Sequence, residues 1–367
     1  MNVVRRLGTA LLAPVGALLV AMIITSVVIQ LSGSAASDFW SIIFSQPSNR
    51  AIVNIIDQSA LIYISALAAA IGFRMNLFNI GVEGQYTMAS YVAATLAGAA
   101  WFSGVLNVVI PLIVAILVGA GWAGIAGLLK VTRGVSEVIS TIMLNAIAVT
   151  LVGYLLNKYG VHEGNSVHST VISESSQLKG WYFFARPDGP VWTLSVLAIL
   201  LGIGFWVLLN KTRFGFDLRA TGMSQSAAVA SGVNVKKMVV VSMLLSGGIA
   251  GLIWMPSFYG SAHSYGTAFQ AGLGFTGIAV ALLGRNQPLG IVFGAALFAF
   301  LNEQSNRLTL ETDISVNVVQ ITQGTIVLAV VVAYEVVRRL SAQREQRIVA
   351  AKLDAESPGG PAEKVTA

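Results

Sequence analysis

Long apolar runs separated by short polar connections dominate the chain from residue 10 onward. A helix needs about 20 apolar residues to cross the hydrocarbon core of a bilayer, and most of these runs approach that length. The pattern predicts ten membrane-spanning helices, over residues 10–31, 54–73, 80–101, 106–129, 136–157, 191–210, 238–258, 271–284, 288–302 and 316–337. The eighth and ninth are short and rich in glycine, which indicates tilted, broken or partly re-entrant segments.

The first apolar run, Thr9–Leu31, also has features of a signal peptide, because the small residues SGSAAS follow it. It is longer than the roughly 7–15 residues of a signal peptide's apolar region. We therefore expect this run to be retained as the first spanning helix.

Lysine and arginine residues are distributed unevenly between alternate connections. With the N-terminus placed in the cytoplasm, 17 of the 22 Lys and Arg residues fall inside and five fall outside. Cytoplasmic connections carry the excess of positive charge in membrane proteins. The distribution therefore predicts an even number of spans and two cytoplasmic termini. If the chain is two duplicated five-helix halves, those halves must be inverted relative to each other.

The composition favours a polytopic, all-α membrane protein. Of 367 residues, 55% are hydrophobic and 10% are charged, whereas a soluble domain has about 25% charged residues. The chain has no cysteine, which excludes disulfides and thiolate chemistry, and three histidines are too few for a histidine-rich metal site. The net charge of +6 fits the positive-inside bias better than it fits nucleic-acid binding.

We expect residues 1–340 to form one transmembrane domain and residues 341–367 to form a cytoplasmic tail that is largely disordered. Residues 158–190 are expected to be an extracytoplasmic loop, with an aromatic cluster that favours an interfacial anchor. Residues 211–237 are expected to be a cytoplasmic loop.

Small residues at helical spacing lie within this cytoplasmic loop. They predict a short helix from Ser224 to Ser231 that ends at Gly232. Small side chains make a flat surface that a larger partner can grip.

The stretch NLFNIGVEGQ, residues 76–85, interrupts the apolar sequence with Asn79, Glu83 and Gln85. An ionised carboxylate facing lipid is costly, so Glu83 is expected to face protein or a wet cavity. These side chains either line a solute path or join neighbouring helices by hydrogen bonds.

A second polar set enters the predicted fifth span. Ser136, Ser140 and Thr141 lie near one face of it, and Glu137 and Asn145 lie close to that face. A face of this kind either packs against another helix or contributes to a path. Glu137 and Arg133, four residues apart, could form a simple ion pair at the helix end.

Four stretches resemble one known family. They are FNIGVEGQ (78–85), EVISTIMLN (137–145), GFDLRATGMSQSAAVASGVNV (215–235) and GFTGIAVALLGRNQPLG (274–290). They are similar to the membrane-spanning permease subunits of bacterial ABC importers, in the branch that serves ribose-type sugars, nucleosides and branched-chain amino acids. The resemblance covers residues 50–337 and is strongest to the nucleoside permeases of the guanosine type.

The resemblance implies a multi-pass subunit in the bacterial cell membrane that carries no catalytic residues, metal or cofactor of its own. The chain has no GxxxxGK[ST] phosphate-binding sequence, so separate cytoplasmic ATPase subunits are expected to bind ATP and Mg²⁺. The other implied partners are a second permease, similar or identical, and an extracytoplasmic solute-binding lipoprotein. Membrane lipid surrounds the subunit, and no nucleic acid is involved.

The stretch 215–235 is similar to the coupling loop that docks on the ATPase. The residues carried over to that role are Arg219, Gly222, Ser226, Ala227, Ala228 and Gly232. The family pattern has Glu-Ala-Ala where this chain has Ser-Ala-Ala. A salt bridge from that first position is therefore not expected, while the small docking surface is retained.

The expected solute is small and neutral, and a nucleoside fits best. Amide and hydroxyl side chains suit a ribose, and aromatic rings can stack on a base. The residues predicted to line the path are Phe78, Asn79, Glu83, Gln85, Ser140, Asn145, Trp254 and Phe258.

Two other functions remain open from the sequence. An ion-gradient-driven transporter could also have inverted repeats, with Glu83 and Glu137 as coupling carboxylates. An ABC permease for a simple sugar would share the family motifs. A channel or an intramembrane enzyme is disfavoured, because neither a carbonyl filter sequence nor a catalytic pair is present.

Overall fold

The computed structural model describes residues 16, 19–31, 35–184, 186–312, 317–333, 339 and 346. The chain divides into two compact units, residues 37–319 and residues 1–36 with 320–367. In the second of these, residues 19–31 and 320–333 are helical. The expected disorder of the tail from residue 341 lies, apart from Gln346, outside the described residues.

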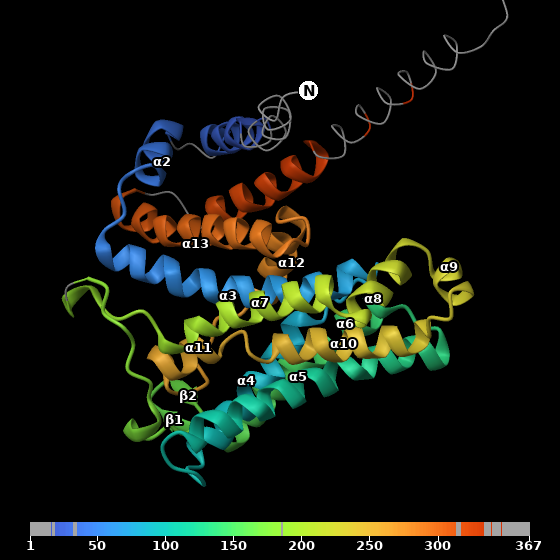
Figure 1. Cartoon of the computed structure of the whole chain (residues 1–367). Helices are drawn as coiled ribbons and strands as arrows, with labels where there is room; N and C mark the ends of the chain where they lie inside the picture. Colours follow the sequence, from blue (N-terminus) through green and yellow to red (C-terminus); the bar gives the residue numbers. More distant parts are fainter. Residues whose placement is uncertain are drawn as a thin grey trace, which may run out of the picture. The chain divides into compact units, whose positions relative to one another are not determined.

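Residues 37–319 form the unit that carries the polar motifs, and it is built almost entirely of helices (Figure 1). The α-helices are α2 (Ala36–Ile43), α3 (Asn49–Arg74), α4 (Val82–Gly98), α5 (Leu106–Arg133), α6 (Glu137–Tyr159), α7 (Val196–Lys211), α8 (Arg213–Met223), α9 (Gln225–Ala230), α10 (Val235–Ala250), α11 (Met255–Ser257), α12 (Leu273–Leu283) and α13 (Pro288–Glu311). A π-turn, Phe258–Ala262, continues α11. The predicted all-α fold is confirmed.

Five helical segments in the described residues are long and apolar enough to cross a membrane. They are Asn49–Arg74, Leu106–Arg133, Glu137–Tyr159, Thr193–Lys211 and Val235–Ala262. Two other helices at predicted spans are shorter, since α4 has 17 residues and α12 has 11. At 1.5 Å per residue, α12 is about 16 Å long, roughly half of a hydrocarbon core of about 30 Å.

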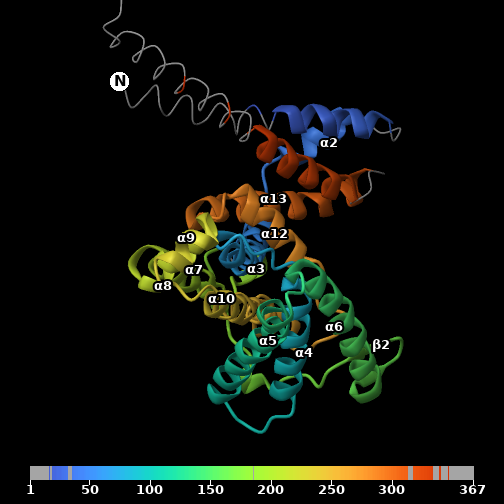
Figure 2. The ribbon, with the colours of Figure 1, turned by 90° about the vertical axis from the view of Figure 1, so that its right-hand side faces the viewer.

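Helix α3 is the central element, and α7, α10, α12 and α13 all pack against it (Figures 1 and 2). Its middle, from Ser65 to Gly72, is rich in alanine and fully buried. Small side chains let neighbouring backbones approach, which is the main source of helix contact where lipid removes the hydrophobic drive. At the closest point, a Cβ on Gly277 of α12 would lie 2.0 Å from Ser65 Oγ.

Buried polar side chains close helix ends in this unit. The carboxylate of Asp57 in α3 accepts hydrogen bonds from Trp192 N (3.0 Å) and Ser195 Oγ (2.7 Å), just before α7. Gln304 Nε2 in α13 donates to the carbonyls of Ile42 and Ile43 at the end of α2 (2.9 and 3.1 Å). Helix ends leave unpaired backbone groups that lipid cannot satisfy, so such side chains replace water.

Two elements of the fold differ from the sequence prediction. The loop 158–190 contains a small antiparallel hairpin, β1 (Val161–Glu163) and β2 (Ser166–His168). The helix at the predicted ninth span is longer than predicted, because α13 continues to Glu311. Gln304, which lies beyond the predicted end at position 302, is buried against α2.

The predicted ion pair between Glu137 and Arg133 is wrong. Glu137 pairs with Lys130 instead. Helix α5 ends at Arg133 with Gly134 in the left-handed conformation, and α6 starts at Glu137. The two residues are therefore not on one helix, and the four-residue spacing does not bring their side chains together.

The crossing of α5 and α10 depends on a glycine at position 119. A Cβ there would lie 2.2 Å from the carbonyl oxygen of Gly247, whereas a Cβ on Gly121 would meet nothing within 4 Å. We expect Gly119→Ala to destabilise the protein by about 1–3 kcal/mol through overpacking, and Gly121→Ala to have little effect. Thermal unfolding in detergent measures the difference. Equal midpoints for the two variants would contradict this packing.

Candidate functional site

The side chain of Asn79 organises the irregular segment between α3 and α4. Its Oδ1 accepts from Gly81 N (3.0 Å) and Gln85 Nε2 (2.9 Å). Its Nδ2 donates to Gln85 Oε1 (3.1 Å) and to Ser246 Oγ of α10 (2.8 Å). The Ser246 hydroxyl in turn donates to the Ala68 carbonyl of α3 (2.6 Å). All of these groups are buried, so the network joins α3, α4 and α10 through satisfied hydrogen bonds.

Asn145 of α6 closes the start of α4 from the other side. Its Oδ1 accepts from Gly84 N (2.8 Å), and its Nδ2 donates to the Ile80 carbonyl (2.8 Å). Gly84 is the third residue of α4, where the backbone N–H has no partner within the helix. Asn145 thus caps α4 from a different helix.

Glu83, in the first turn of α4, does the same for α12. Its Oε1 accepts from Gly272 N (2.7 Å), and its Oε2 accepts from Gly274 N (2.9 Å). A helix N-terminus carries partial positive charge, which favours a carboxylate at this position. The hydroxyl of Tyr86 adds contacts to Glu83 Oε1 (3.2 Å) and to the Gln270 carbonyl (2.7 Å). We call this set of bonds the Glu83 clasp.

The clasp brings the N-termini of two short helices together. A Cβ on Gly274 would lie 2.6 Å from Glu83 Cα, so only glycine allows this approach. Irregular backbone precedes both helices, at 75–81 before α4 and 263–272 before α12. Short helices whose N-termini converge next to irregular, protein-covered backbone are typical of solute sites in transporters.

Aromatic rings gather beside the clasp. Tyr86 of α4 stacks on Phe269 (centroids 5.2 Å apart), and Trp254 contacts Phe258, Tyr265 and Phe269 at 5.3–5.7 Å. Tyr265 and Phe269 are 4.6 Å apart and lie on the irregular segment before α12. We call these five rings the aromatic cluster.

At the start of that irregular segment, burial lowers the pKa of the His263 imidazole. The lowered pKa favours the neutral form of the imidazole.

The structure brings most of the predicted path residues together but separates two of them. Phe78 is 47% exposed and packs edge-on against Phe73, with centroids 5.4 Å apart. Ser140 is buried, and its hydroxyl donates to the Ser136 carbonyl of its own helix (2.6 Å). Neither side chain has a hydrogen bond to the Asn79 network or the clasp.

Sequence reasoning missed several members of this region. Ser246, Tyr86, Tyr265 and Phe269 were not singled out, although Tyr265 and Phe269 stand in a glycine-rich connection between two apolar runs. Aromatic residues in such a connection were the sequence feature that could have identified these two residues. The hydrogen bonds from the glycines at the start of α12 could not be predicted, because every residue except proline has a backbone N–H.

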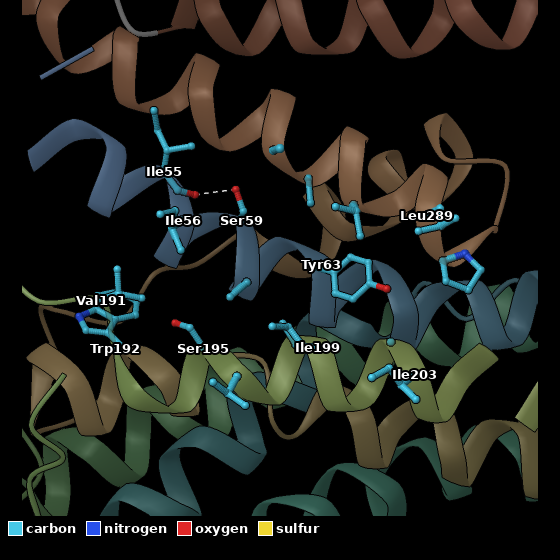
Figure 3. Close-up of a pocket in the computed structure, with 18 of the residues that line it drawn as sticks. Ile55, Ile56, Ser59, Tyr63, Val191, Trp192, Ser195, Ile199, Ile203 and Leu289 are labelled. Atoms are coloured by element: carbon cyan, nitrogen blue, oxygen red, sulfur yellow. Dashed lines mark hydrogen bonds between the residues drawn. The ribbon is translucent and has the colours of Figure 1, made fainter. Parts of the chain in front are cut away.

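A separate groove of about 850 Å³ lies between α3, α7 and the start of α13 (Figure 3). Ile55 and Tyr63 of α3 face Ile199 and Ile203 of α7 across it. Its lining is almost wholly apolar and contains none of the predicted path residues. Such a surface suits lipid chains or another apolar helix better than a solute rich in hydroxyl groups.

The predicted coupling segment folds as two helices, α8 and α9. The Ser224 hydroxyl caps α9 by accepting from Ala227 N (3.3 Å), and Gly232 has a left-handed φ of +84°. The short helix therefore occurs where the sequence predicts it. Ala227 and Ser226 are exposed, whereas Ala228 is buried.

Two other residues predicted for coupling, Arg219 and Gly222, hold α8 in place. Arg219 donates to the Leu209 carbonyl at the end of α7. A Cβ on Gly222 would lie 2.3 Å from the Arg74 carbonyl, so α8 packs directly on the end of α3. Met223, the last residue of α8, is 88% exposed.

The family model for the permease component of branched-chain amino acid transport systems matches residues 51–334. The chain belongs to this family. This confirms the resemblance drawn from the four sequence stretches. The chain is therefore a transport subunit embedded in a membrane.

Relatives of the chain include ABC transporter permeases. It is 34% identical over 340 residues to the guanosine ABC transporter permease NupP of Bacillus subtilis, covering 89% of this chain and 94% of the relative. It is 26% identical to the nucleoside permease NupB of Lactococcus lactis, covering 78% and 80%. It is 25% identical to the ribose import permease RbsC of Escherichia coli, covering 70% and 78%.

The Asn79 network predicts that replacing Asn79 destabilises the protein, whereas replacing an exposed asparagine does not. Asn79→Ala leaves the Gln85 amide and the Gly81 N–H without their partner, which costs about 1–3 kcal/mol. Asn165→Ala, in the exposed turn of the hairpin, is the control. Thermal unfolding in detergent should show a lower midpoint for Asn79→Ala alone. If the two variants unfold together, the network contributes nothing to stability.

Proposed function

We propose that this chain is the membrane-spanning subunit of an ATP-driven importer of nucleosides in a bacterial cell membrane. The observation that carries the proposal is the 34% identity to a guanosine permease over nearly the full length of both chains. Nucleosides are neutral, and buried amides, hydroxyls and aromatic rings suit them. The ribose permease, at 25% identity, supports a sugar substrate less well.

Ten spans with both termini in the cytoplasm remain our topology. The excess of lysine and arginine on one side supports it. The meeting of α4 and α12 at the Glu83 clasp supports two inverted halves, because these helices are the third span of the first half and the third span of the second. Their opposite directions would place both N-termini within the membrane.

The solute path in this proposal runs beside the clasp and the aromatic cluster. Asn79, Gln85 and Asn145 hold the helix ends that border it. Glu83 has its carboxylate bonded to α12. Trp254 and Phe258 supply flat surfaces for a base. Phe78 and Ser140 stand outside this group, and any contact they make with solute belongs to another part of the path.

Separate partners supply energy and solute. Cytoplasmic ATPase subunits bind ATP and Mg²⁺ and dock on α8 and α9, with Arg219, Gly222 and Gly232 shaping the surface. A second permease subunit, similar or identical, completes the membrane part. A solute-binding lipoprotein delivers the nucleoside to the extracytoplasmic loop 158–190.

Transport into sealed vesicles tests the function. Vesicles contain the chain with its ATPase and permease partners, and tritiated guanosine is added with the solute-binding protein. We expect ATP-dependent accumulation that other nucleosides compete for. Competition by ribose alone would identify a sugar permease. Uptake that ionophores abolish and an inactive ATPase leaves intact would identify a gradient-driven transporter.

The coupling surface predicts a specific loss of partner binding. Ala227→Arg puts a large charged side chain on the small exposed face of α9, so the ATPase should no longer co-purify with the tagged chain. Thr132→Arg, exposed near the end of α5, is the matched control and should retain the ATPase. Retention by both variants would move the docking site away from α9.

A further inference from the structure

The indole of Trp254 is the strongest sign of a ligand in the described residues. The side chain is 0% exposed, and no described group accepts a hydrogen bond from its Nε1–H. An indole N–H can only donate, and a buried donor without an acceptor is costly. The Ser90 hydroxyl of α4 is also buried without a partner.

Flat apolar surface surrounds this donor. Tyr86 stacks on Phe269, and Tyr265 and Phe269 both pack against Trp254. A nucleobase supplies the acceptor that the Trp254 N–H lacks, through its ring nitrogens or carbonyl oxygens. Its aromatic faces can also stack on the surrounding rings. A bare sugar offers acceptors but no aromatic face.

Two of the rings, those of Tyr265 and Phe269, lie on the irregular segment 263–272, which packs over Trp254 and Tyr86. Trp254 and Tyr86 are fully buried, while Phe269 is partly exposed and its neighbours Thr267 and Ala268 are exposed. The segment 263–272 has no regular structure. Moving Phe269 outward would open the faces of Trp254 and Tyr86 without breaking a helix.

Both ends of this segment are tied to other elements. Tyr265 exchanges hydrogen bonds with Ser169, N to Oγ at 2.9 Å and the returning Ser169 N to Tyr265 O at 2.7 Å. Ser169 follows the hairpin in the loop 158–190. At the other end, the Glu83 clasp holds Gly272 and Gly274. The segment therefore has two anchors and an irregular middle that carries Phe269.

We propose that the aromatic cluster is the closed form of a nucleobase-binding site. In it, Phe269 occupies the place that a base takes between Trp254 and Tyr86, and Trp254 Nε1–H donates to an acceptor on the base. This inference rests on the proposed nucleoside function and adds the residues that recognise the base.

Binding of tritiated guanosine to the detergent-purified permease–ATPase complex tests the hydrogen bond. Trp254→Phe keeps a ring and removes the N–H, so affinity should fall about tenfold or more. Trp206→Phe, on the exposed face of α7, should bind as the unaltered protein does. Equal affinity of all three proteins would overturn the role of the N–H and leave a buried water as its partner.

Photolabelling of the unaltered complex tests the site without any substitution. Light-activated 8-azidoguanosine should label peptides that contain Trp254, Tyr265 or Phe269, and excess guanosine should prevent this. Labelling confined to other segments would overturn the proposal.

A further pair of variants distinguishes a base-binding site from a ring that only blocks the solute path, which we call a plug. Phe269→Leu is compared with Phe275→Leu, which alters an exposed ring on α12. We expect Phe269→Leu alone to change guanosine affinity. A plug would instead leak solutes of every kind with unchanged affinity.

Failure of the proposed function and failure of the base-binding site give different results. If the complete importer takes up no nucleoside, the proposed function falls and this site falls with it. If it imports guanosine while Trp254→Phe binds normally and the aromatic cluster stays unlabelled, only the base-binding site is wrong.

Discussion

The carboxylate of Glu83 at the start of α12 is the interaction on which the rest of this structure depends. Lipid offers no hydrogen bonds, so backbone groups at a helix end must find partners within the protein. Glu83 provides acceptors for two of the N–H groups of α12, while Asn145 and Asn79 serve the start of α4. These side chains allow two short helices to end inside the protein.

In the proposed function, that arrangement provides the place for solute within an otherwise apolar sequence. Continuous helices would fill the unit with apolar side chains, whereas the paired helix ends gather amides, hydroxyls and rings at one position. The same segments link distant parts of the chain. The segment before α12 is bonded at Tyr265 to Ser169, just after the hairpin, and at Gly272 to the clasp. At the other end of the unit, α8 packs on the end of α3, next to the surface proposed for the ATPase.

The sequence pattern predicted the structural features that depend only on neighbouring residues. Apolar runs located the helices, and Ser224 with Gly232 located α9 because a cap and a left-handed turn are local features. Partners could not be predicted. Glu83 and Gly272 are 189 positions apart, and the group that Glu83 binds is backbone, which every residue possesses. The predicted ion pair between Glu137 and Arg133 was wrong for a related reason. A four-residue spacing assumes one continuous helix, and the chain leaves the helical conformation at Gly134.

Hydrogen exchange at the start of α12 tests the central claim most directly. Glu83→Gln preserves the size of the side chain but replaces one acceptor oxygen with an amide nitrogen that cannot accept. In the intact protein, the peptide containing Gly272 and Gly274 should exchange slowly, and in Glu83→Gln it should exchange much faster while peptides of α5 stay unchanged. Identical exchange in both proteins would show that the carboxylate does not hold α12, and would contradict the account.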